Sequence, residues 1–490
     1  MQVNVTRKDY KFLPDPSRVI ARFLYTSDER SKDIINNVLA MTDNEASIAL
    51  SQVLRGYARR HRNISVIFER HFHKLDNLFN DLGIKQSDII KSKQALIGSF
   101  FTKEYSIESA AFFNPSVVED PDQSELGPDE KRLIFSFRAT GEGHISSIVF
   151  RSAVIDKYSN LIIEPVGKML AEADRIKRHI YHKNSFIKRL DEMRDFDNNI
   201  SPVFVLEKLG DSFTYGELKR AIEVTRKTHQ LSQNKEKIIQ QMMWLAKSHY
   251  EIDFSIDSAI SERVIFPISE CERNGIEDAR FVKFTYDNGE VSYFATYTAY
   301  DGVTILPRLL ETKDFYHFKA LSIHGDIARN KGMALFPRKI KNKFAMLCRI
   351  DGVSNYIAYS DEINIWHEAK IIQTPKFSWE LIQVGNCGSP IETKEGWLVI
   401  THGVGPMREY VLGASLYELD DPEKEIGRLK TPLLSPNAEE REGYVPNVVY
   451  SCGSIIHNGN LIIPYAMSDY SATYASVDLS ELLEELKNSR

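Results

Sequence analysis

The spacing of apolar residues divides the chain into helical and strand-forming blocks. Between residues 28 and 100, and again from about 166 to 250, apolar residues recur at three- and four-residue spacing, as on the buried face of a helix. Each block contains a capping box ahead of a helix, at residues 42–45 (Thr-Asp-Asn-Glu) and 214–217 (Thr-Tyr-Gly-Glu). The pattern therefore predicts an N-terminal helical region and a helical insertion.

In the rest of the chain the apolar period is two, which is the period of β-strands. The runs LIFSFRAT (133–140) and HISSIVFRSAV (144–154) precede the insertion, and short runs separated by turns fill 264–478. Many short strands with regular turns are typical of a sandwich, barrel or propeller. We expect a mainly β protein with an N-terminal extended and helical region (1–104), first strands (105–165), a helical insertion (166–263), the remaining strands (264–478) and a C-terminal helix (479–490).

Composition narrows the class of protein. The chain has 490 residues, 42% hydrophobic and 27% charged, which suits a folded protein with more than one core. The net charge of −6 argues against a nucleic-acid partner held by bulk charge. The first residues hold no apolar run, and no stretch of about 18 apolar residues occurs, so we expect neither a signal peptide nor a membrane span. The four cysteines are far apart, which suits a reduced, cytoplasmic protein.

The acidic pair Glu277-Asp278, with Arg280 close behind, is the leading candidate for chemistry. It stands at the start of two strand-like runs, FVKFTY and VSYFATYTAY, which are joined by a turn at residues 287–289. A carboxyl group beside a guanidinium can act as a general acid with its orienting partner. Taken alone, such a pair is more often a solvated turn. A second Glu-Asp pair offers Asp120 as an alternative acid, in a polar loop.

The other motifs in the sequence are weaker evidence of function than this acidic pair. The chain has no phosphate-binding loop, dinucleotide fingerprint, nucleophile elbow or HExxH zinc motif. The run Arg70-His71-Phe72-His73-Lys74 is either a metal or anion patch or the solvated face of a helix, and we favour the solvated face. Polar residues also stand at the ends of the predicted strands; they are Asn114, Arg138, His144, Arg151, Asp278, Arg280, Lys331, Arg349, His402, Tyr410 and Asp469.

Several sequence blocks resemble glycoside hydrolase family 130, the mannoside phosphorylases and β-mannosidases built on a five-bladed β-propeller. GIEDAR (275–280) resembles the family's G-[IV]-E-D-P-R motif. The resemblance extends over roughly 105–165 and 264–478. Its other blocks are NKGMALFPRKIKNKFAMLCRIDG (330–352), VGNCGSPIETKEGWLVITHGV (384–404), EYVLGASLYELDDP (409–422), EREGYVPNVVYSCG (440–453) and IPYAMSD (463–469).

The resemblance implies a fold and a set of site residues. The fold is mainly β, a five-bladed β-propeller with an N-terminal helical region and a helical insertion; 105–165 holds its first strands and 264–478 the remainder. Asp278 is implied as the catalytic acid. The residues implied to bind phosphate are Lys331, Arg349, His402 and Tyr410. Those implied to bind substrate are Asn114, Arg138, His144, Arg151, Arg280 and Asp469.

The implied reaction is inverting phosphorolysis of β-linked manno-oligosaccharides, which gives α-mannose 1-phosphate. Asp278 donates the proton, in the family through a sugar hydroxyl. Phosphate is a dianion and needs cationic donors, which Lys331 and Arg349 would supply. We therefore expect a β-manno-oligosaccharide and inorganic phosphate as substrates, no cofactor and no metal, and no nucleic acid or membrane partner. The long helical additions resemble those of larger oligomannan phosphorylases, so we favour a β-1,2 linkage and expect a homo-oligomer.

Two alternatives stay open, and the motifs depart from the family in two places. The protein could be a phosphate-independent β-mannosidase of the same fold, which needs a second carboxylate as base rather than an anion site. It could also be a non-catalytic propeller that binds partners through its helical blocks. Ala279 replaces the family's proline after the acid. Gln383 replaces a lysine that is common in the phosphate site, which removes one positive charge.

Overall fold

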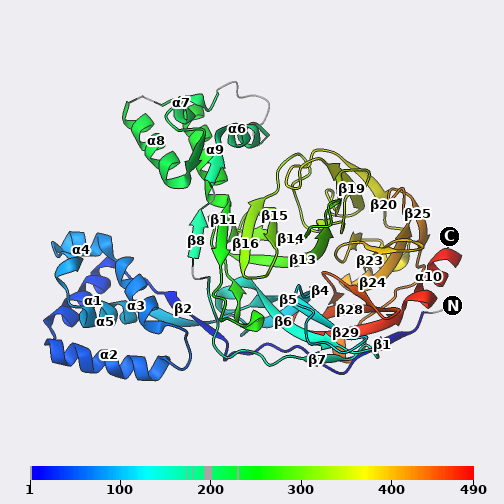
Figure 1. The fold of residues 1–490 in the computed structure, drawn as a ribbon, viewed down its shortest axis with the longest axis horizontal. Helices are drawn as coiled ribbons and strands as arrows, with labels where there is room; N and C mark the ends of the chain where they lie inside the picture. Colours follow the sequence, from blue (N-terminus) through cyan, green and yellow to red (C-terminus); the bar gives the residue numbers. More distant parts are fainter. Residues whose placement is uncertain (1–2, 174, 179, 193–200, 229–230, 490) are drawn as a thin grey trace.

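Two helical lobes flank a β-rich body (Figure 1). The computed structural model describes residues 3–173, 175–178, 180–192, 201–228 and 231–489. The N-terminal lobe contains α1 (Asp28–Ala40), α2 (Asp43–Tyr57), α3 (Ile64–His73), α4 (Asp76–Leu82) and α5 (Lys91–Phe100). The second lobe contains α6 (Lys183–Glu192), α7 (Val203–Leu206), α8 (Tyr215–Thr228) and α9 (Gln233–Ser248), and the C-terminal helix is α10 (Leu479–Asn488).

The first capping box forms as the sequence predicts. The hydroxyl of Thr42 accepts from the backbone N–H of Glu45, and the Glu45 carboxylate accepts from the backbone N–H of Thr42 at 2.7 Å. Each lobe also buries its own apolar cluster, around Phe72 and Phe79 in the first and around Leu218 and Met242 in the second. Among the described residues, no helix is both long and apolar enough to cross a membrane.

The mainly β character is confirmed. An eleven-stranded sheet contains two antiparallel strand groups joined by one parallel pairing, Gly275 with Ser146. Its main path runs β4 (Ala111–Glu119), β5 (Lys131–Thr140), β6 (Ser146–Ile155), β13 (Gly275–Thr285), β14 (Val291–Tyr300), β15 (Ile305–Thr312), β16 (His317–Ser322), β11 (Tyr250–Asp253) and β8 (Arg175–Arg178). Two short strands, β7 (Leu161–Ile163) and β12 (Val264–Ile265), also pair with β6.

Three further strand groups complete the body. One has β17 (Ala334–Leu335), β18 (Phe344–Cys348), β19 (Asn355–Ser360) and β20 (Ala369–Gln373). The next has β21 (Gln383–Asn386), β22 (Ile391–Thr393), β23 (Gly396–Val404), β24 (Tyr410–Tyr417) and β25 (Glu425–Arg428). The last has β26 (Val449–Tyr450), β27 (Ile455–His457), β28 (Asn460–Met467), β29 (Ser471–Asp478) and β1 (Val5–Arg7). Two-stranded sheets pair β2 (Val19–Phe23) with β3 (Thr102–Ser106), and β9 (Ile180–His182) with β10 (Ser212–Thr214).

The prediction of helix throughout 166–250 is wrong where short strands form, both within the block, at β9 and β10, and at its edges. β8 and β11 pair with each other, and β11 also pairs with β16, so both extend the large sheet. Residues 250–253 (Tyr-Glu-Ile-Asp) alternate between buried and half-buried positions, as a strand does. Four residues directly after the apolar pattern of α9 are too few for their period to be recognised.

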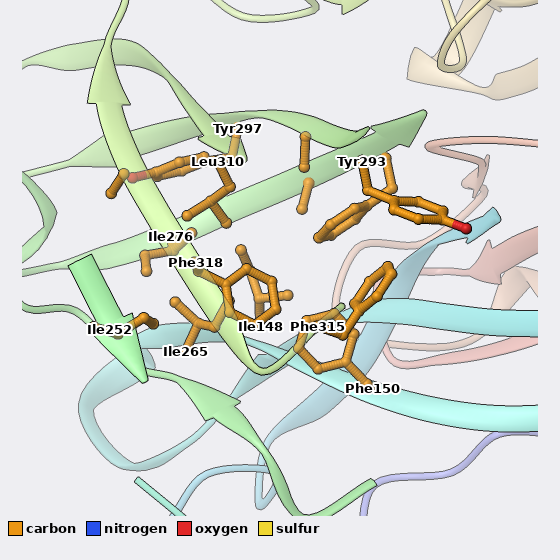
Figure 2. Close-up of a cluster of buried hydrophobic side chains, with 14 of the residues drawn as sticks. Ile148, Phe150, Ile252, Ile265, Ile276, Tyr293, Tyr297, Leu310, Phe315 and Phe318 are labelled. Carbon is orange, nitrogen blue, oxygen red and sulfur yellow. The ribbon is translucent and has the colours of Figure 1, made fainter. Parts of the chain in front are cut away.

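An aromatic cluster fills the core of the large sheet (Figure 2). Phe150 of β6 packs edge-on against Phe281 of β13 and against Phe315, with ring centroids 5.9 Å apart in both pairs. The Tyr293 ring of β14 lies 5.0 Å from that of Phe315. Strands distant in sequence are therefore fixed against each other by apolar burial.

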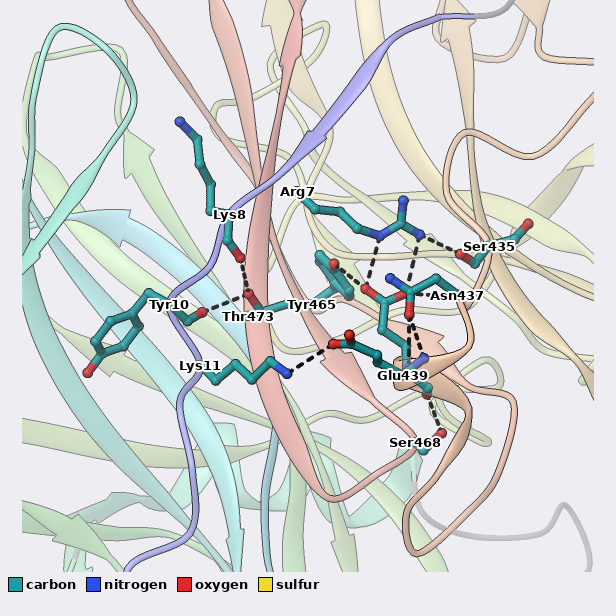
Figure 3. A network of polar contacts seen from close by, with 11 residues as sticks. Arg7, Lys8, Tyr10, Lys11, Ser435, Asn437, Glu439, Tyr465, Ser468 and Thr473 are labelled. Carbon is teal, nitrogen blue, oxygen red and sulfur yellow. Dashed lines mark hydrogen bonds and ion pairs between the residues drawn. The ribbon is translucent and has the colours of Figure 1, made fainter.

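The N-terminal segment closes the last strand group. β1 pairs antiparallel with β29, and Phe12 forms a further bridge with Ala472. Figure 3 shows the polar contacts that reinforce this edge. Arg7 donates to Glu440, at 3.0 Å from Nε, and to the carbonyl of Ser435. Further contacts are Lys11 with Glu439, Tyr465 with Glu440, Glu440 with Asn437 and Ser468, and Thr473 with the carbonyls of Lys8 and Tyr10.

Removing the Phe12 ring should loosen this closure. The ring is buried against Phe135 and Phe137, so Phe12→Ala should destabilise the N-terminal edge by about 3–5 kcal/mol. Hydrogen exchange of the β29 amides measures the effect as faster local opening. The matched control is Leu13→Ala, because Leu13 is 56% exposed and should change exchange little. Unchanged β29 protection in Phe12→Ala would show that the segment does not hold this edge.

Candidate active site

Polar residues from separate strand groups meet at one end of the β body. The strand pairings put the start of β4 beside the end of β5, and the start of β13 beside the end of β14. Contacts between the groups join these ends: the side-chain amide of Asn114 in β4 donates to Asp278 in β13 at 2.6 Å. Arg280 donates to the carbonyl of Asn386 in β21 at 3.0 Å and to the hydroxyl of Tyr450 in β26 at 2.6 Å.

Left-handed backbone positions aim three of the polar side chains. Asn114 (φ 49°) and Asp278 (φ 53°) both lie where the register of their strand shifts at a β-bulge. Asp469 (φ 52°) lies in the turn between β28 and β29. Asn and Asp tolerate positive φ better than most residues, and bulges redirect side chains. The bulges therefore allow Asn114 and Asp278 to meet across two strands. Ala279, the departure from the family motif, lies within the unpaired part of the second bulge.

Glu277 binds two cations beside Asp278. Its carboxylate accepts from Arg138 Nη2 at 2.7 Å and from Lys331 Nζ at 2.5 Å. The Asp278 carboxylate lies 3.6 Å from Arg138 Nη1. Because Glu277 is buried, its ion pairs satisfy a charge that would be costly if left alone. The two adjacent carboxylates thus share Arg138, and Glu277 fixes where that guanidinium sits.

The charges around Asp278 set its protonation. Burial alone would raise the pKa of its carboxyl group. The charges of Arg138 and Lys331 and the hydrogen bond from Asn114 outweigh burial, so the pKa lies below its usual value. Asp278 is therefore ionised at neutral pH in the ligand-free protein.

Asp469 is shifted in the opposite direction. Burial, followed by the negative charge of Asp278, raises the pKa of Asp469 to about 6, against the opposing charges of Arg138 and Arg408. The pKa values of two nearby carboxyl groups are thus shifted in opposite directions. Such a separation of pKa values distinguishes acid and base roles in an active site.

Arg280 connects this cluster to a second one. Its guanidinium is buried and its N–H donors are used on Asn386 and Tyr450. Asn386 in turn donates to the Gly332 carbonyl at 2.7 Å, close to Lys331 in the chain. Arg280 therefore acts as a strut between three strand groups, and its charge reaches both clusters.

The second cluster contains Arg349, His402 and Gln383. Arg349 Nη1 and the Gln383 side-chain amide each lie 3.0 Å from His402 Nε2. With its oxygen facing Arg349 and His402, the Gln383 amide can also donate to the Gly352 carbonyl. The Tyr410 ring stacks parallel to the His402 ring, with centroids 6.1 Å apart. Guanidinium, imidazole and phenol groups thus gather at one place.

His402 carries no charge at neutral pH. Burial, with the charges of Arg349 and Arg280, holds the pKa of its imidazole well below the usual value. A neutral ring can still donate one N–H to an anion. The positive charge of this cluster therefore comes from Arg349 and from the nearby Arg280.

The family model described as beta-1,4-mannooligosaccharide phosphorylase matches residues 225–488, more than half of the chain. The protein belongs to glycoside hydrolase family 130. This confirms the resemblance carried by the sequence motifs.

Similar proteins carry phosphorylase names. The chain is 35% identical over 221 residues to 1,2-beta-oligomannan phosphorylase of Thermoanaerobacter sp. (strain X514), covering 44% of this chain and 72% of that protein. It is 31% identical over 252 residues to beta-1,2-mannobiose phosphorylase of Listeria innocua serovar 6a, covering 50% and 68%. The solved beta-1,2-mannobiose complex of a phosphorylase from Listeria innocua aligns with TM-score 0.47 and 23% identity, covering 79% of this chain and 94% of that one.

The family motifs pointed to residues that the structure brings together. One cluster contains Asn114, Arg138, Asp278 and Lys331. Asp469 lies close enough for the charges of Asp278 and Arg138 to shift its pKa. The other contains Arg349, His402 and Tyr410, and Arg280 joins the two. Lys331, which the motif assigned to phosphate, is paired with Glu277 in this structure.

Two further residues predicted to bind substrate, Arg151 and His144, have contacts outside the two clusters. Arg151 is buried, donates to Glu108 at 2.9 Å and lies over the Phe112 ring, so it serves the core. The Arg151 side chain is thus engaged within the sheet packing, and its role in substrate binding stays a prediction. His144 is exposed in the turn after β5, with its ring 5.6 Å from that of Tyr444. The alternative acid Asp120 directly follows β4, at the opposite end of that strand from Asn114.

The roles of several site residues could not be predicted from the sequence. Glu277 was visible as half of an acidic pair, but only the structure shows that it binds Arg138 and Lys331. Asn386 and Tyr450 lie inside recognised blocks without any signal of their own, since their roles follow from contacts with Arg280.

The raised pKa of Asp469 predicts a pH-dependent effect of Asp469→Asn. Between about pH 4 and about pH 6 the unfolded chain ionises this group while the folded protein keeps the proton, so folding loses stability as pH rises. Asn removes that loss. The stability of Asp469→Asn relative to the unmutated protein should therefore increase from about pH 4.5 to about pH 7, as measured by urea unfolding.

Asp301→Asn is the control. Hydrogen bonds from the backbone of Thr304 lower the pKa of Asp301, so its contribution is already complete above about pH 4 and should not vary over this range. If the stability difference between Asp469→Asn and the unmutated protein were also constant over this pH range, the pKa of Asp469 would not be raised.

Proposed function

We propose that this protein is a β-mannoside phosphorylase that cleaves β-linked manno-oligosaccharides by inverting phosphorolysis and releases α-mannose 1-phosphate. The observation that carries the proposal is the junction at Arg280. Its charge acts both on the carboxylate of Asp278 and on the Arg349–His402 cluster. A candidate acid and a candidate anion site are therefore parts of one centre.

Phosphate binding would prepare Asp278 to act as an acid. In the free protein the surrounding cations keep the Asp278 pKa low. A phosphate dianion held near Arg349 and Arg280 would offset those charges and raise the pKa, so that Asp278 takes up a proton. The protonated carboxyl then matches the pKa that general acid catalysis requires near neutral pH.

Phosphate oxygen forms a bond to C1 of the mannosyl residue as the bond from C1 to the glycosidic oxygen breaks. The proton of Asp278 moves to the leaving oxygen, directly or through a sugar hydroxyl. The phosphate ester releases one proton after reaction, which restores the acid. Attack from the face opposite the leaving group inverts the β-linkage to the α-configuration.

Cationic donors favour phosphate over water as the nucleophile. Arg349 supplies charge, and neutral His402 and the hydroxyl of Tyr410 supply hydrogen bonds. Lys331 would either leave Glu277 and bind the anion, or donate to both Glu277 and the anion. Asn114, Arg138 and Asp469 would hold the hydroxyls of the mannosyl residue in the adjacent subsite. No cofactor enters this scheme, and inorganic phosphate is the co-substrate.

Several finer features belong to the same proposal. The five blades of a propeller would be β4–β7, β13–β16, β17–β20, β21–β25 and β26–β29 with β1. Two relatives named for β-1,2-linked substrates support the β-1,2 linkage. The description of the family model names β-1,4-linked substrates instead. We also propose a cytoplasmic homo-oligomer whose helical lobes narrow the side where the acceptor sugar leaves.

Phosphate dependence tests the reaction. The protein is incubated with β-1,2-, β-1,3- and β-1,4-linked mannobiose, with and without inorganic phosphate, and sugar phosphate and free mannose are both quantified. We expect sugar phosphate from the β-1,2 substrate only when phosphate is present. Equal release of free mannose with and without phosphate would identify a hydrolase, with Asp469 as the first residue to examine as its base. No turnover of any substrate would favour a binding protein.

Asp278→Asn tests the acid. Since Asn keeps the size but loses the transferable proton, kcat should fall by about 10²–10⁴-fold while phosphate still binds. Phosphate affinity by calorimetry accompanies the rate measurement. The matched control is Asp120→Asn, which changes the other Glu-Asp pair and should leave kcat unaltered. An active Asp278→Asn variant with an inactive Asp120→Asn variant would move the acid to Asp120.

A further inference from the structure

A basic cavity lies between the N-terminal lobe and the β body. The lobe meets the body near β2 (Figure 1). The volume of the cavity is about 450 Å³, and it opens between α3 and β2 on one side and β11 and β12 on the other. A smaller cleft of about 180 Å³ shares Ala21, Arg70 and Glu172 with it. The larger volume is that of a small-molecule site, and junctions between units commonly hold such sites.

Three cations line the cavity, and they come from separate places. Arg22 belongs to β2, Arg70 to the last turn of α3, and Lys74 to its C-terminal cap. The dipole of α3 favours cations at its C-terminal end, which accounts for Arg70 and Lys74. It does not account for Arg22. Arg70, His73 and Lys74 of the run 70–74 are exposed, as the prediction of a solvated face requires, and Arg70 and Lys74 also border the cavity.

The charged groups of these cations have no close partner in the described protein. Within the described ranges, no carboxylate oxygen lies at ion-pair distance from Arg22, Arg70 or Lys74, and their side-chain nitrogens make no hydrogen bond there. Among the described residues that line the cavity, Glu172 is the single carboxylate, and three cations face it there. The surplus is unexpected in a chain of net charge −6.

The arrangement of the three groups is suited to an anion. The Arg22 guanidinium carbon lies over the Phe266 ring, 4.1 Å from its centroid, and a guanidinium can bind an anion in a bidentate contact through its N–H groups. Lys74 rests over the Phe23 ring at 5.1 Å. Burial, followed by the charge of Arg70, lowers the pKa of Lys74, against the opposing charge of Glu172.

We propose that this cavity binds a phosphate dianion, either as inorganic phosphate or as the phosphate group of a small monoester. Arg22, Arg70 and Lys74 hold the dianion, and Glu172 accepts from hydroxyl groups of an ester. The ligand bridges the N-terminal lobe and the β body, so its binding steadies the lobe. The site is separate from the proposed catalytic centre, because its residues come from β2, α3 and the segment before β8, outside both clusters described above.

Calorimetry on the full chain tests the site. An Arg349→Ala background weakens anion binding at the catalytic centre, and the probes are inorganic phosphate, glycerol 3-phosphate and, as the uncharged control, glycerol. We expect saturable binding of at least one phosphate probe and none of glycerol. Because two of the three cations are lost, Arg70→Ala/Lys74→Ala should weaken it by about tenfold or more. The comparison between phosphate and its ester shows which source the site takes.

Three further variants separate binding from folding. Arg70→Lys/Lys74→Arg keeps the charges and should retain binding. Glu172→Gln removes the opposing charge and should tighten inorganic phosphate several-fold. Arg55→Ala/Arg59→Ala changes cations of the same lobe that do not line the cavity and should have no effect. Binding unaffected by Arg70→Ala/Lys74→Ala, or weakened equally by Arg55→Ala/Arg59→Ala, would overturn the proposal.

Discussion

The ion pairs of Glu277 with Arg138 and Lys331 are the interaction on which the centre depends. They place two cations beside Asp278, whose own ion pair with Arg138 is longer, at 3.6 Å. A buried Glu277 without these partners would be strongly unfavourable, and the cations without Glu277 would move onto Asp278. Glu277 thus fixes the positions of the two cations that set the electrostatic field around Asp278, the proposed acid.

Backbone geometry makes this field possible. The bulge at Asp278 turns neighbouring carboxylates into different surroundings, one in close ion pairs and the other beside Asn114. The left-handed positions of Asn114, Asp278 and Asp469 are tolerated because short polar side chains suit them. The apolar packing beneath, with Phe150 and Phe281 in contact, keeps β6 and β13 in place. Strain at the bulges is therefore supported by burial elsewhere.

Local patterns in the sequence predicted local structure well. The three- and four-residue spacing predicted the helices between residues 28 and 100, and the capping box of Thr42 formed as expected. The family motifs led to Asp278, Arg349 and His402, which lie in one centre. Short strands next to helices were lost, as at β11, because four residues carry too little of a period.

Features that depend on contacts distant in sequence could not be predicted. The pairing of Lys331 with Glu277, the neutral state of His402 and the engagement of Arg151 by Glu108 all follow from packing. The same holds for β1, which joins strands from the opposite end of the chain. The basic cavity also falls into this class, since Arg22 and Arg70 meet only after the lobe folds.

The configuration of the first product tests the central claim most directly. ¹H and ³¹P NMR can follow a β-linked mannobiose and inorganic phosphate from the start of the reaction with the full chain. We expect α-mannose 1-phosphate as the first phosphorylated product, because in the proposed mechanism phosphate attacks the face opposite the bond that Asp278 would help to break. A β-configured sugar phosphate, or free mannose with no phosphate incorporated, would contradict it.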